Sequence, residues 1–444
     1  MTAELARVGT QARDVALHES VIRSHRLDRL RDRRGGQPVD VAPAAPVAPP
    51  GDRASAALLA RGVGGSVLGS SSGSVVVVER RTPLEVDLGP LREMPQPVDP
   101  TRPIVCLDTE TTGLGTAAGT LPFLVALGRW QGDVMVIRQL LLPDHPDEPA
   151  FLDALERHLP PDALLVTYNG RSFDWPLIAN RYRLHGRRPP QVADHLDLLP
   201  VARQLWRHRL PDARLASVEA GVASVTRHGD LPGALIPEMY FDWLRRRDPG
   251  VFQGILEHNH QDVLSLALLL RVLAHELLPA RGPSGGRVVP PRDLMGLGRL
   301  YGRKGRHEDA LQCFETAMER LVLPWQQREL QAHLGRERAR TLGRLGRRDE
   351  ARSAWEAVAL EGGPAAPHAW IQVAKWLEHG ARDYAGATRA ARRAEALAAR
   401  LRYLGEPQPG IERDLVRRLR RLDRRSGVSR PPSATPAVPA RLAG

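Results

Sequence analysis

Cysteine is almost absent from this sequence of 444 residues, which contains two. Cys106 lies in an apolar stretch expected to be a buried strand, and Cys313 lies on the apolar face of an expected helix. Neither spacing is that of a disulfide framework or a zinc site, so the class of disulfide-stapled secreted domains is excluded. The cysteine pattern therefore predicts a protein of the reducing cytoplasm.

Long apolar runs are also missing. No run of about 18 apolar residues is present, which is the length that a membrane-spanning helix requires. The N-terminal residues do not contain the short apolar core of a secretory signal peptide. We therefore expect a soluble protein with no membrane partner and no visible route of export.

Lysine is nearly absent, because Lys304 and Lys375 are the only two, so arginine carries the formal net charge of +12. A bias this complete indicates a genome-wide composition effect, and the distribution of charge is more informative. Residues 102–276 hold 18 arginines against 21 acidic residues, a net of −3. Residues 389–430 hold 13 arginines against 5 acidic residues, a net of +8. The excess positive charge is therefore concentrated near the C-terminus.

The length and the 42% hydrophobic content suit two or three globular domains, while 38 prolines and 40 glycines imply linkers. Composition and periodicity divide the chain into five expected regions. They are a disordered, low-complexity region with a possible Arg-rich helix at 1–73, an α/β domain at 74–279 with its motifs at 103–278, a linker at 280–291, helical repeats at 292–425, and a disordered tail at 426–444.

Two carboxylates follow an apolar run in the stretch from Ile104 to Gly113. Asp108 and Glu110 are spaced i, i+2, and a strand places such residues on the same face. Paired carboxylates repel each other unless a positive partner lies between them, and Mg²⁺ or Mn²⁺ is the partner that suits hard oxygen ligands. The alternative is a strand end whose acids face water.

The element order after residue 103 predicts a mixed five-stranded sheet with helices on both faces. Apolar segments at 103–108, 121–128 and 134–142 are the first three strands, and Gln131 to Asp133 suits a hairpin turn. Further strands are expected at 163–167 and 195–199.

Two more acids are expected close to the first pair. Asp174 begins a helix after the strand at 163–167, and Asp262 lies on a long helix expected over residues 249–278. The helix dipole could account for Asp174, and Asp262 could lie at a solvated border. Alternatively, both carboxylates converge on Asp108 and Glu110.

Four acids in this order resemble the carboxylate set of the DEDD exonucleases, which have a ribonuclease-H-like fold. The segments D-T-E-T-T-G-L, G-T-L-P-F-L, T-Y-N-G-R-S-F-D-W-P-L-I, H-L-D-L-L, D-L-P-G and H-N-H-Q-D-V resemble the bacterial YprB-like family over about residues 75–278. The resemblance implies an enzyme in which Asp108, Glu110, Asp174 and Asp262 hold two Mg²⁺ or Mn²⁺ ions. It also implies 3′→5′ hydrolysis of single-stranded DNA or RNA ends.

His258 departs from the pattern of those exonucleases, which have His five residues or Tyr four residues before the last Asp. His258 occupies the Tyr position, and i, i+4 spacing from Asp262 would let it face the acids and orient water. A surface or capping histidine is the alternative. Asn169, Arg171 and Phe173 are candidate substrate contacts. The alternatives are that Asn169 is a turn residue, Arg171 a solvated side chain and Phe173 a core residue.

The C-terminal region resembles tetratricopeptide repeats. The segment Gly305-Arg-His-Glu-Asp-Ala310 recurs as Gly346-Arg-Arg-Asp-Glu-Ala351, with a weaker copy ending at Ala387. Farther on, Arg413, Arg417, Arg420 and Arg424 share one helical face and could bind phosphates, or simply be a solvated surface.

Two other classes of function compete with a metal-dependent nuclease. One is a catalytically weak or silent ribonuclease-H-like module that binds nucleic acid, and the other is a scaffold whose repeats bind a protein partner. The four intact acids favour the nuclease. The choice between DNA and RNA remains open.

Overall fold

The computed structural model describes residues 53–96, 98–113, 119–227, 229–278, 289–322 and 327–425. The Arg-rich helix expected within residues 1–35, most of the linker at 280–291 and the tail at 426–444 lie outside these ranges.

A mixed sheet forms the centre of the α/β region, with the strand order β1-β2-β5-β4-β3-β6-β7. Its strands are β1 (Ser66–Ser70), β2 (Gly73–Pro83), β3 (Ile104–Thr111), β4 (Pro122–Gln131), β5 (Val134–Leu141), β6 (Leu164–Thr167) and β7 (Asp194–Asp197). The predicted hairpin is confirmed, because β4 and β5 pair antiparallel around Gly132. Strand β3 pairs antiparallel with β4 and parallel with β6, which also pairs parallel with β7.

The prediction of five strands is wrong, because the sheet has seven. Strand β2 pairs antiparallel with β5, and β1 pairs antiparallel with β2 at the edge of the sheet. The run of valines within β2 indicates a strand, but its place depends on pairing with residues about 60 positions away. Such long-range pairing has no local sequence signal.

The expectation of disorder across residues 1–73 is wrong for residues 53–73. Helix α2 (Arg53–Val63) and strand β1 lie there. Ala56, Leu59 and Ala60 are buried in the core at i, i+3, i+4 spacing, which is the pattern of an apolar helical face. The Ala- and Gly-rich composition of the segment concealed this pattern. Strand β1 is exposed along its whole length and depends on backbone pairing with β2, which composition does not reveal.

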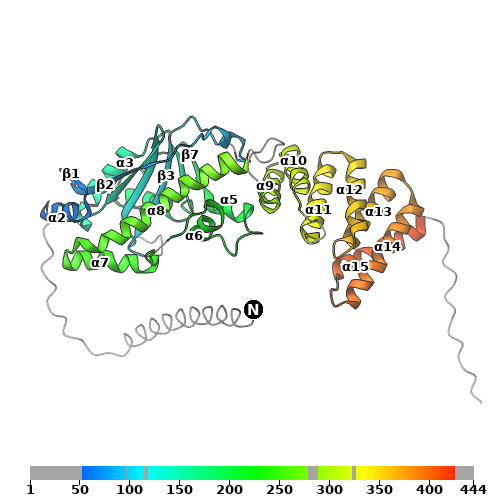
Figure 1. Cartoon of the computed structure of the whole chain (residues 1–444). Helices are drawn as coiled ribbons and strands as arrows, with labels where there is room; N and C mark the ends of the chain where they lie inside the picture. Colours follow the sequence, from blue (N-terminus) through cyan, green and yellow to red (C-terminus); the bar gives the residue numbers. More distant parts are fainter. Residues whose placement is uncertain are drawn as a thin grey trace, which may run out of the picture. The chain divides into compact units, whose positions relative to one another are not determined.

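Helices cover both faces of the sheet (Figure 1). They are α3 (Glu148–His158), α4 (Asp174–Leu184), α5 (Leu198–Leu205), α6 (Leu215–Val218), α7 (Ile236–Arg246) and α8 (Phe252–Arg271). Alternate residues of β3 enter two different apolar clusters. Ile104 and Cys106 pack with residues of α5 and α8, whereas Val105 and Leu107 pack with residues of α3 and α4.

Helix α8 lies close against the middle of the sheet, in contact with β3, β4 and β5 (Figure 1). Gly128 of β4 permits this approach, because a Cβ atom there would lie 2.6 Å from Cγ1 of Val263. The absence of a side chain at this position therefore allows α8 to place polar groups over the end of β3.

The C-terminal region is helical throughout its described part. Its helices are α9 (Pro291–Arg303), α10 (His307–Glu319), α11 (Arg328–Arg344), α12 (Arg348–Glu361), α13 (Ala366–Trp376), α14 (Tyr384–Tyr403) and α15 (Pro409–Arg425). The two similar sequence segments form similar turns, because Gly305 and Gly346 share a φ of 77°. In each turn the following arginine donates its backbone N–H to a carbonyl five residues earlier. Assignment of the helices to tetratricopeptide repeats remains a prediction.

The first helix of that region packs on the α/β region. A Cβ atom at Gly296 of α9 would lie 2.3 Å from the carbonyl oxygen of Leu205, and the Tyr301 hydroxyl donates to the Glu93 carbonyl at 2.6 Å. Within the described part of the chain, no helix has the length and apolar character needed to cross a membrane.

Candidate active site

Two of the four candidate acids lie on strand β3, as their spacing predicts. Asp108 and Glu110 continue the alternation of Ile104 and Cys106, so they lie on the face that α8 covers. The register between β3 and β4 shifts after Glu110, at Thr111. Both carboxylates therefore lie next to an irregularity in the strand, in the region where the helix crosses the sheet.

The third acid, Asp174, is the first residue of α4, which follows the parallel strand β6. Its carboxylate accepts a hydrogen bond from the Thr109 hydroxyl, and Thr109 lies between the two acids of β3. A helix N-terminus favours a carboxylate, because the first backbone N–H groups lack partners within the helix. This hydrogen bond ties the start of α4 to the end of β3.

The fourth acid, Asp262, lies on α8, and the same helix reaches Asp108 through Asn259. The Asn259 side chain is fully buried and donates to Asp108 Oδ2 at 2.8 Å. Gln139 of β5 donates in turn to Asn259 Oδ1 at 3.1 Å and to the Leu256 carbonyl at 2.8 Å. These bonds fix α8 over β3 and hold the acid-bearing part of the helix in place.

The four acids influence one another's ionisation. Withdrawal from water, followed by repulsion from Asp262, Asp174 and Glu110, raises the pKa of Asp108 well above its usual range. Withdrawal from water and the same kind of repulsion raise the pKa of Glu110. Burial raises the pKa of Asp174 to about 6, although the Thr109 hydrogen bond opposes the shift. These carboxylates share one low-dielectric site and repel one another.

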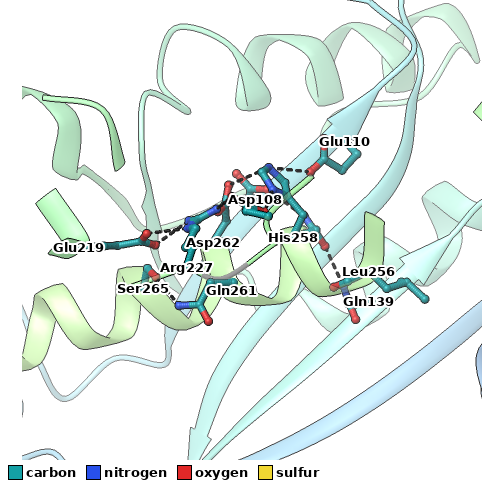
Figure 2. Close-up of polar contacts among 12 residues, drawn as sticks. Asp108, Glu110, Gln139, Glu219, Arg227, Leu256, His258, Gln261, Asp262 and Ser265 are labelled. Carbon is teal, nitrogen blue, oxygen red and sulfur yellow. Dashed lines mark hydrogen bonds and ion pairs between the residues drawn. The ribbon is translucent and has the colours of Figure 1, made fainter. Parts of the chain in front are cut away.

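Arg227 provides positive charge beside this cluster. Its guanidinium donates two hydrogen bonds of 2.6 Å to the fully buried carboxylate of Glu219, one of 2.9 Å to Asp230, and one to Asp262. Figure 2 shows Arg227 lying between Glu219 and Asp262. Burial raises the pKa of Asp262, and the charge of Arg227 is the largest influence that opposes this rise.

His258 faces the acids, as its spacing on the helix predicts. Its Nε2 lies 3.9 Å from Glu110 Oε1 and 3.9 Å from Asp262 Oδ2 (Figure 2). On its other side, Nδ1 lies 2.6 Å from Asp230 Oδ1. Asp230 thus fixes the orientation of the imidazole and leaves the second ring nitrogen directed at the candidate site.

The three candidate substrate contacts lie in the turn between β6 and α4. Asn169 is exposed, with a left-handed φ of 70°, and its backbone N–H donates to Asp197 at 2.8 Å, which fits a turn role. The Arg171 guanidinium donates to the His195 carbonyl and lies 3.8 Å from Asp194, so in this structure it is bound to strand β7. Phe173 is half-buried and directly precedes Asp174.

The donor set suits Mg²⁺ or Mn²⁺, because all four candidate ligands are carboxylates whose pKa values are raised, by burial first and then by repulsion from neighbouring acids. Across the described ranges, however, no three His, Cys, Asp or Glu side chains form a group that could hold a metal ion. In this arrangement three of the four carboxylates accept hydrogen bonds from protein donors: Asp108 from Asn259, Asp174 from Thr109 and Asp262 from Arg227.

Sequence reasoning assigned no role to Arg227, Glu219, Asp230 or Asn259, although Asp230 begins the segment D-L-P-G and Asn259 lies in H-N-H-Q-D-V. The i, i+3 spacing of Asn259 and Asp262 on one helix could have indicated Asn259. Glu219 lies in a π-helical segment, Glu219–Ala223, and Arg227 in the irregular segment after it. No periodicity connects such residues to β3, so their positions depend on the tertiary fold.

Two comparisons with known proteins cover the part of the chain that contains this site. Residues 105–274 match the RNase_H superfamily. The matched range runs from β3 through α8 and contains all four candidate acids and His258. Over 173 residues the chain is 38% identical to the uncharacterized protein YprB of Bacillus subtilis (strain 168). That alignment covers 38% of this chain and 42% of the relative, so it spans less than half of either protein.

Proposed function

We propose that this protein is a divalent-metal-dependent exonuclease that hydrolyses phosphodiester bonds at single-stranded ends of DNA or RNA, in the 3′→5′ direction. The superfamily match of residues 105–274 indicates nuclease-like hydrolysis of nucleic acid in general. The dependence on metal, the DEDD type and the polarity go further, and for these the proposal relies on the four acids and on the resemblance of their surrounding motifs.

One observation carries the proposal. Four carboxylates from a central strand and two separate helices lie together in a buried site, where burial first and mutual repulsion second raise the pKa values of Asp108, Glu110 and Asp174. Such mutual repulsion reduces the stability of the folded chain unless a cation offsets it. An all-carboxylate set of this kind suits two Mg²⁺ or Mn²⁺ ions.

Each residue has a definite role in this proposal. Asp108, Glu110, Asp174 and Asp262 would hold the two ions, which together activate water and stabilise charge on the scissile phosphate. His258, oriented by Asp230, would accept a hydrogen bond from the attacking water through Nε2. Asn259 and Thr109 hold Asp108 and Asp174 in position. Arg171 and Phe173 remain candidate contacts to the nucleic acid.

A direct assay tests this function. The purified full chain is incubated with Mg²⁺ or Mn²⁺ and with 3′- or 5′-labelled single- and double-stranded DNA and RNA. We expect stepwise release of mononucleotides from the 3′ end of a single strand. We expect Asp108→Asn to lower the rate by at least about 10³-fold, because the central ligand is lost. The variant should remain folded, since Asn can still accept the Asn259 hydrogen bond and repulsion is reduced.

Glu257→Gln is the matched control, because Glu257 lies beside His258 on α8 but is exposed and pairs with Arg80. This variant should cleave at the wild-type rate. Wild-type protein that binds these oligonucleotides yet cleaves none of them with either ion would contradict the proposal and support a silent binding module. Release of the 5′ label first would contradict the polarity alone.

A further inference from the structure

Arg227 is held by an unusual excess of negative charge. It donates to three carboxylates, those of Glu219, Asp230 and Asp262. The Glu219 side chain has no exposed surface, and that of Arg227 is 12% exposed. A buried Glu requires such a partner, so this pair fixes the guanidinium in place. The contact with Asp262 is then made by an arginine that is already anchored elsewhere.

Asp262 is the point at which this arginine meets the candidate metal ligands. Arg227 Nη2 donates to Asp262 Oδ1, while Asp262 Oδ2 faces His258 at 3.9 Å. A carboxylate oxygen that accepts a charge-assisted hydrogen bond has less electron density to offer a metal ion. A guanidinium and a divalent cation at neighbouring positions also repel each other. Arginine and metal therefore compete for the same carboxylate.

We propose that Arg227 is a positioning residue that acts as a built-in cation, occupying Asp262 until a divalent ion displaces it. This inference rests on the proposed metal site. The Glu219 and Asp230 contacts remain when Asp262 is released, so the arginine stays beside the site. In the absence of metal, Arg227 offsets part of the repulsion among the acids. In the presence of metal, it weakens binding at the ligand it shares.

Calorimetric titration with Mn²⁺ alone, without nucleic acid, tests this competition, and electron paramagnetic resonance of free Mn²⁺ provides a second readout. We expect Arg227→Gln to bind Mn²⁺ about tenfold more tightly than the wild-type chain, because a competing charge is removed. Loss of structure cannot produce tighter binding, so this readout separates competition from a purely structural role. In an Asp262→Asn background the gain in affinity should be clearly smaller, since the competition for Asp262 is removed and only the direct repulsion between the two cations remains.

Arg227→Gln leaves Glu219 buried without its partner and could prevent folding. The double variant Glu219→Gln/Arg227→Gln replaces both charges with neutral amides and should show the same gain in Mn²⁺ affinity. Arg214→Gln is the control, because the Arg214 side chain is 84% exposed and pairs only weakly, 3.9 Å from Asp212. It should leave the affinity unchanged.

Two different results would overturn either the competition between Arg227 and metal or the metal site itself, and the experiment distinguishes them. Equal or weaker Mn²⁺ binding by both Arg227 variants, with measurable binding by the wild-type chain, overturns the competition and leaves the proposed function intact. Absence of Mn²⁺ binding in every variant overturns the metal site itself, and the competition with it.

Discussion

Two fully buried glutamates form ion pairs with arginine in this molecule, one beside the candidate active site and one in the helical region. Glu219 bonds to Arg227, whose other partners are also acids. Glu378 lies in the π-helical segment Leu377–Ala381 and bonds to Arg418 at 2.9 Å and Arg421 at 2.7 Å, both from α15. The two networks use the same chemistry with opposite charge balance.

The difference in charge balance distinguishes the Glu378 network, which is structural, from the Arg227 network, which is part of the candidate site. Arg425 adds a third cation 3.5 Å from Glu378, and the hydrogen bond from Arg421 lowers the pKa of that glutamate. In the candidate site one arginine faces three acids, and the pKa values of Asp108 and Glu110 are raised. The Glu378 network has more cations than acids, so its buried carboxylate is fully compensated, whereas the Arg227 network has an excess of negative charge that a bound cation would offset.

The largest effect expected to sharpen this contrast concerns His258. If the acid cluster is catalytic, His258→Ala should lower kcat by about 10²–10⁴-fold with KM largely kept, because a positioned acid–base group is lost. Steady-state cleavage of a 3′-labelled oligonucleotide at several concentrations measures both constants. Glu257→Gln again provides the control. A kcat within a few-fold of the wild-type value would show that His258 does not orient or deprotonate the attacking water.

The next effect compares stability in the two networks without metal. Glu378→Gln should destabilise the folded chain by about 3–5 kcal/mol at pH 7, because it leaves buried Arg418 without its main charge partner. Asp174→Asn should instead stabilise it by up to about 3 kcal/mol, since the pKa of Asp174 rises from 3.8 to about 6 on folding. Urea unfolding in the presence of EDTA measures both changes.

Acidification should affect the two variants differently. The ionisation penalty at Asp174 grows from pH 4 to about pH 6 and is constant above that, so the gain from Asp174→Asn should vanish near pH 4. The pKa of Glu378 is lowered from 4.5, so its stabilising contribution is full above that pH and is lost only as the pH falls further. A destabilising Asp174→Asn at pH 7 would contradict the charge excess assigned to the site.

Local patterns predicted much of this fold and the placement of the acids. The i, i+2 spacing of Asp108 and Glu110 placed them on one face, and the polar turn from Gln131 to Asp133 between two apolar segments predicted the β4–β5 hairpin. The i, i+4 spacing of His258 and Asp262 placed both on one side of α8. In each case the information lies within a few residues of chain and follows the period of the element.

Features that depend on distant residues were not predicted. Strand β1 has no buried side chain, so only its pairing with β2 makes it a strand. Glu219 and Arg227 lie outside regular α-helix, and their approach to Asp262 depends on how residues 219–227 pack against α8. Nothing in the sequence indicated that Arg418 and Arg421 pair with Glu378, because Glu378 lies 40 and 43 residues away from them.

The smallest effect on catalysis is expected from changes to the exposed face of α15, which lies opposite the face that packs on Glu378. Leu415, Arg418, Leu419 and Leu422 are buried, whereas the predicted stripe of Arg413, Arg417, Arg420 and Arg424 is exposed. Because residues 102–276 carry a net charge of −3, a nucleic acid would gain more attraction from this stripe than from the α/β region as a whole. The buried network holds α15 in place, so the exposed arginines can be changed without removing the helix.

Replacing the four exposed arginines with Gln should weaken binding of single-stranded DNA or RNA and reduce its salt dependence. Removing one arginine–phosphate ion pair lowers the magnitude of the slope of log K against log salt by about 0.7, so the fourfold change would lower it by about 3. Cleavage at saturating substrate should change little, because the acids are untouched. Arg344→Gln/Arg348→Gln, at exposed positions on other helices, should leave the slope unchanged. If the fourfold variant binds with the wild-type slope, the stripe does not bind phosphates, and the helical region is better assigned to a protein partner.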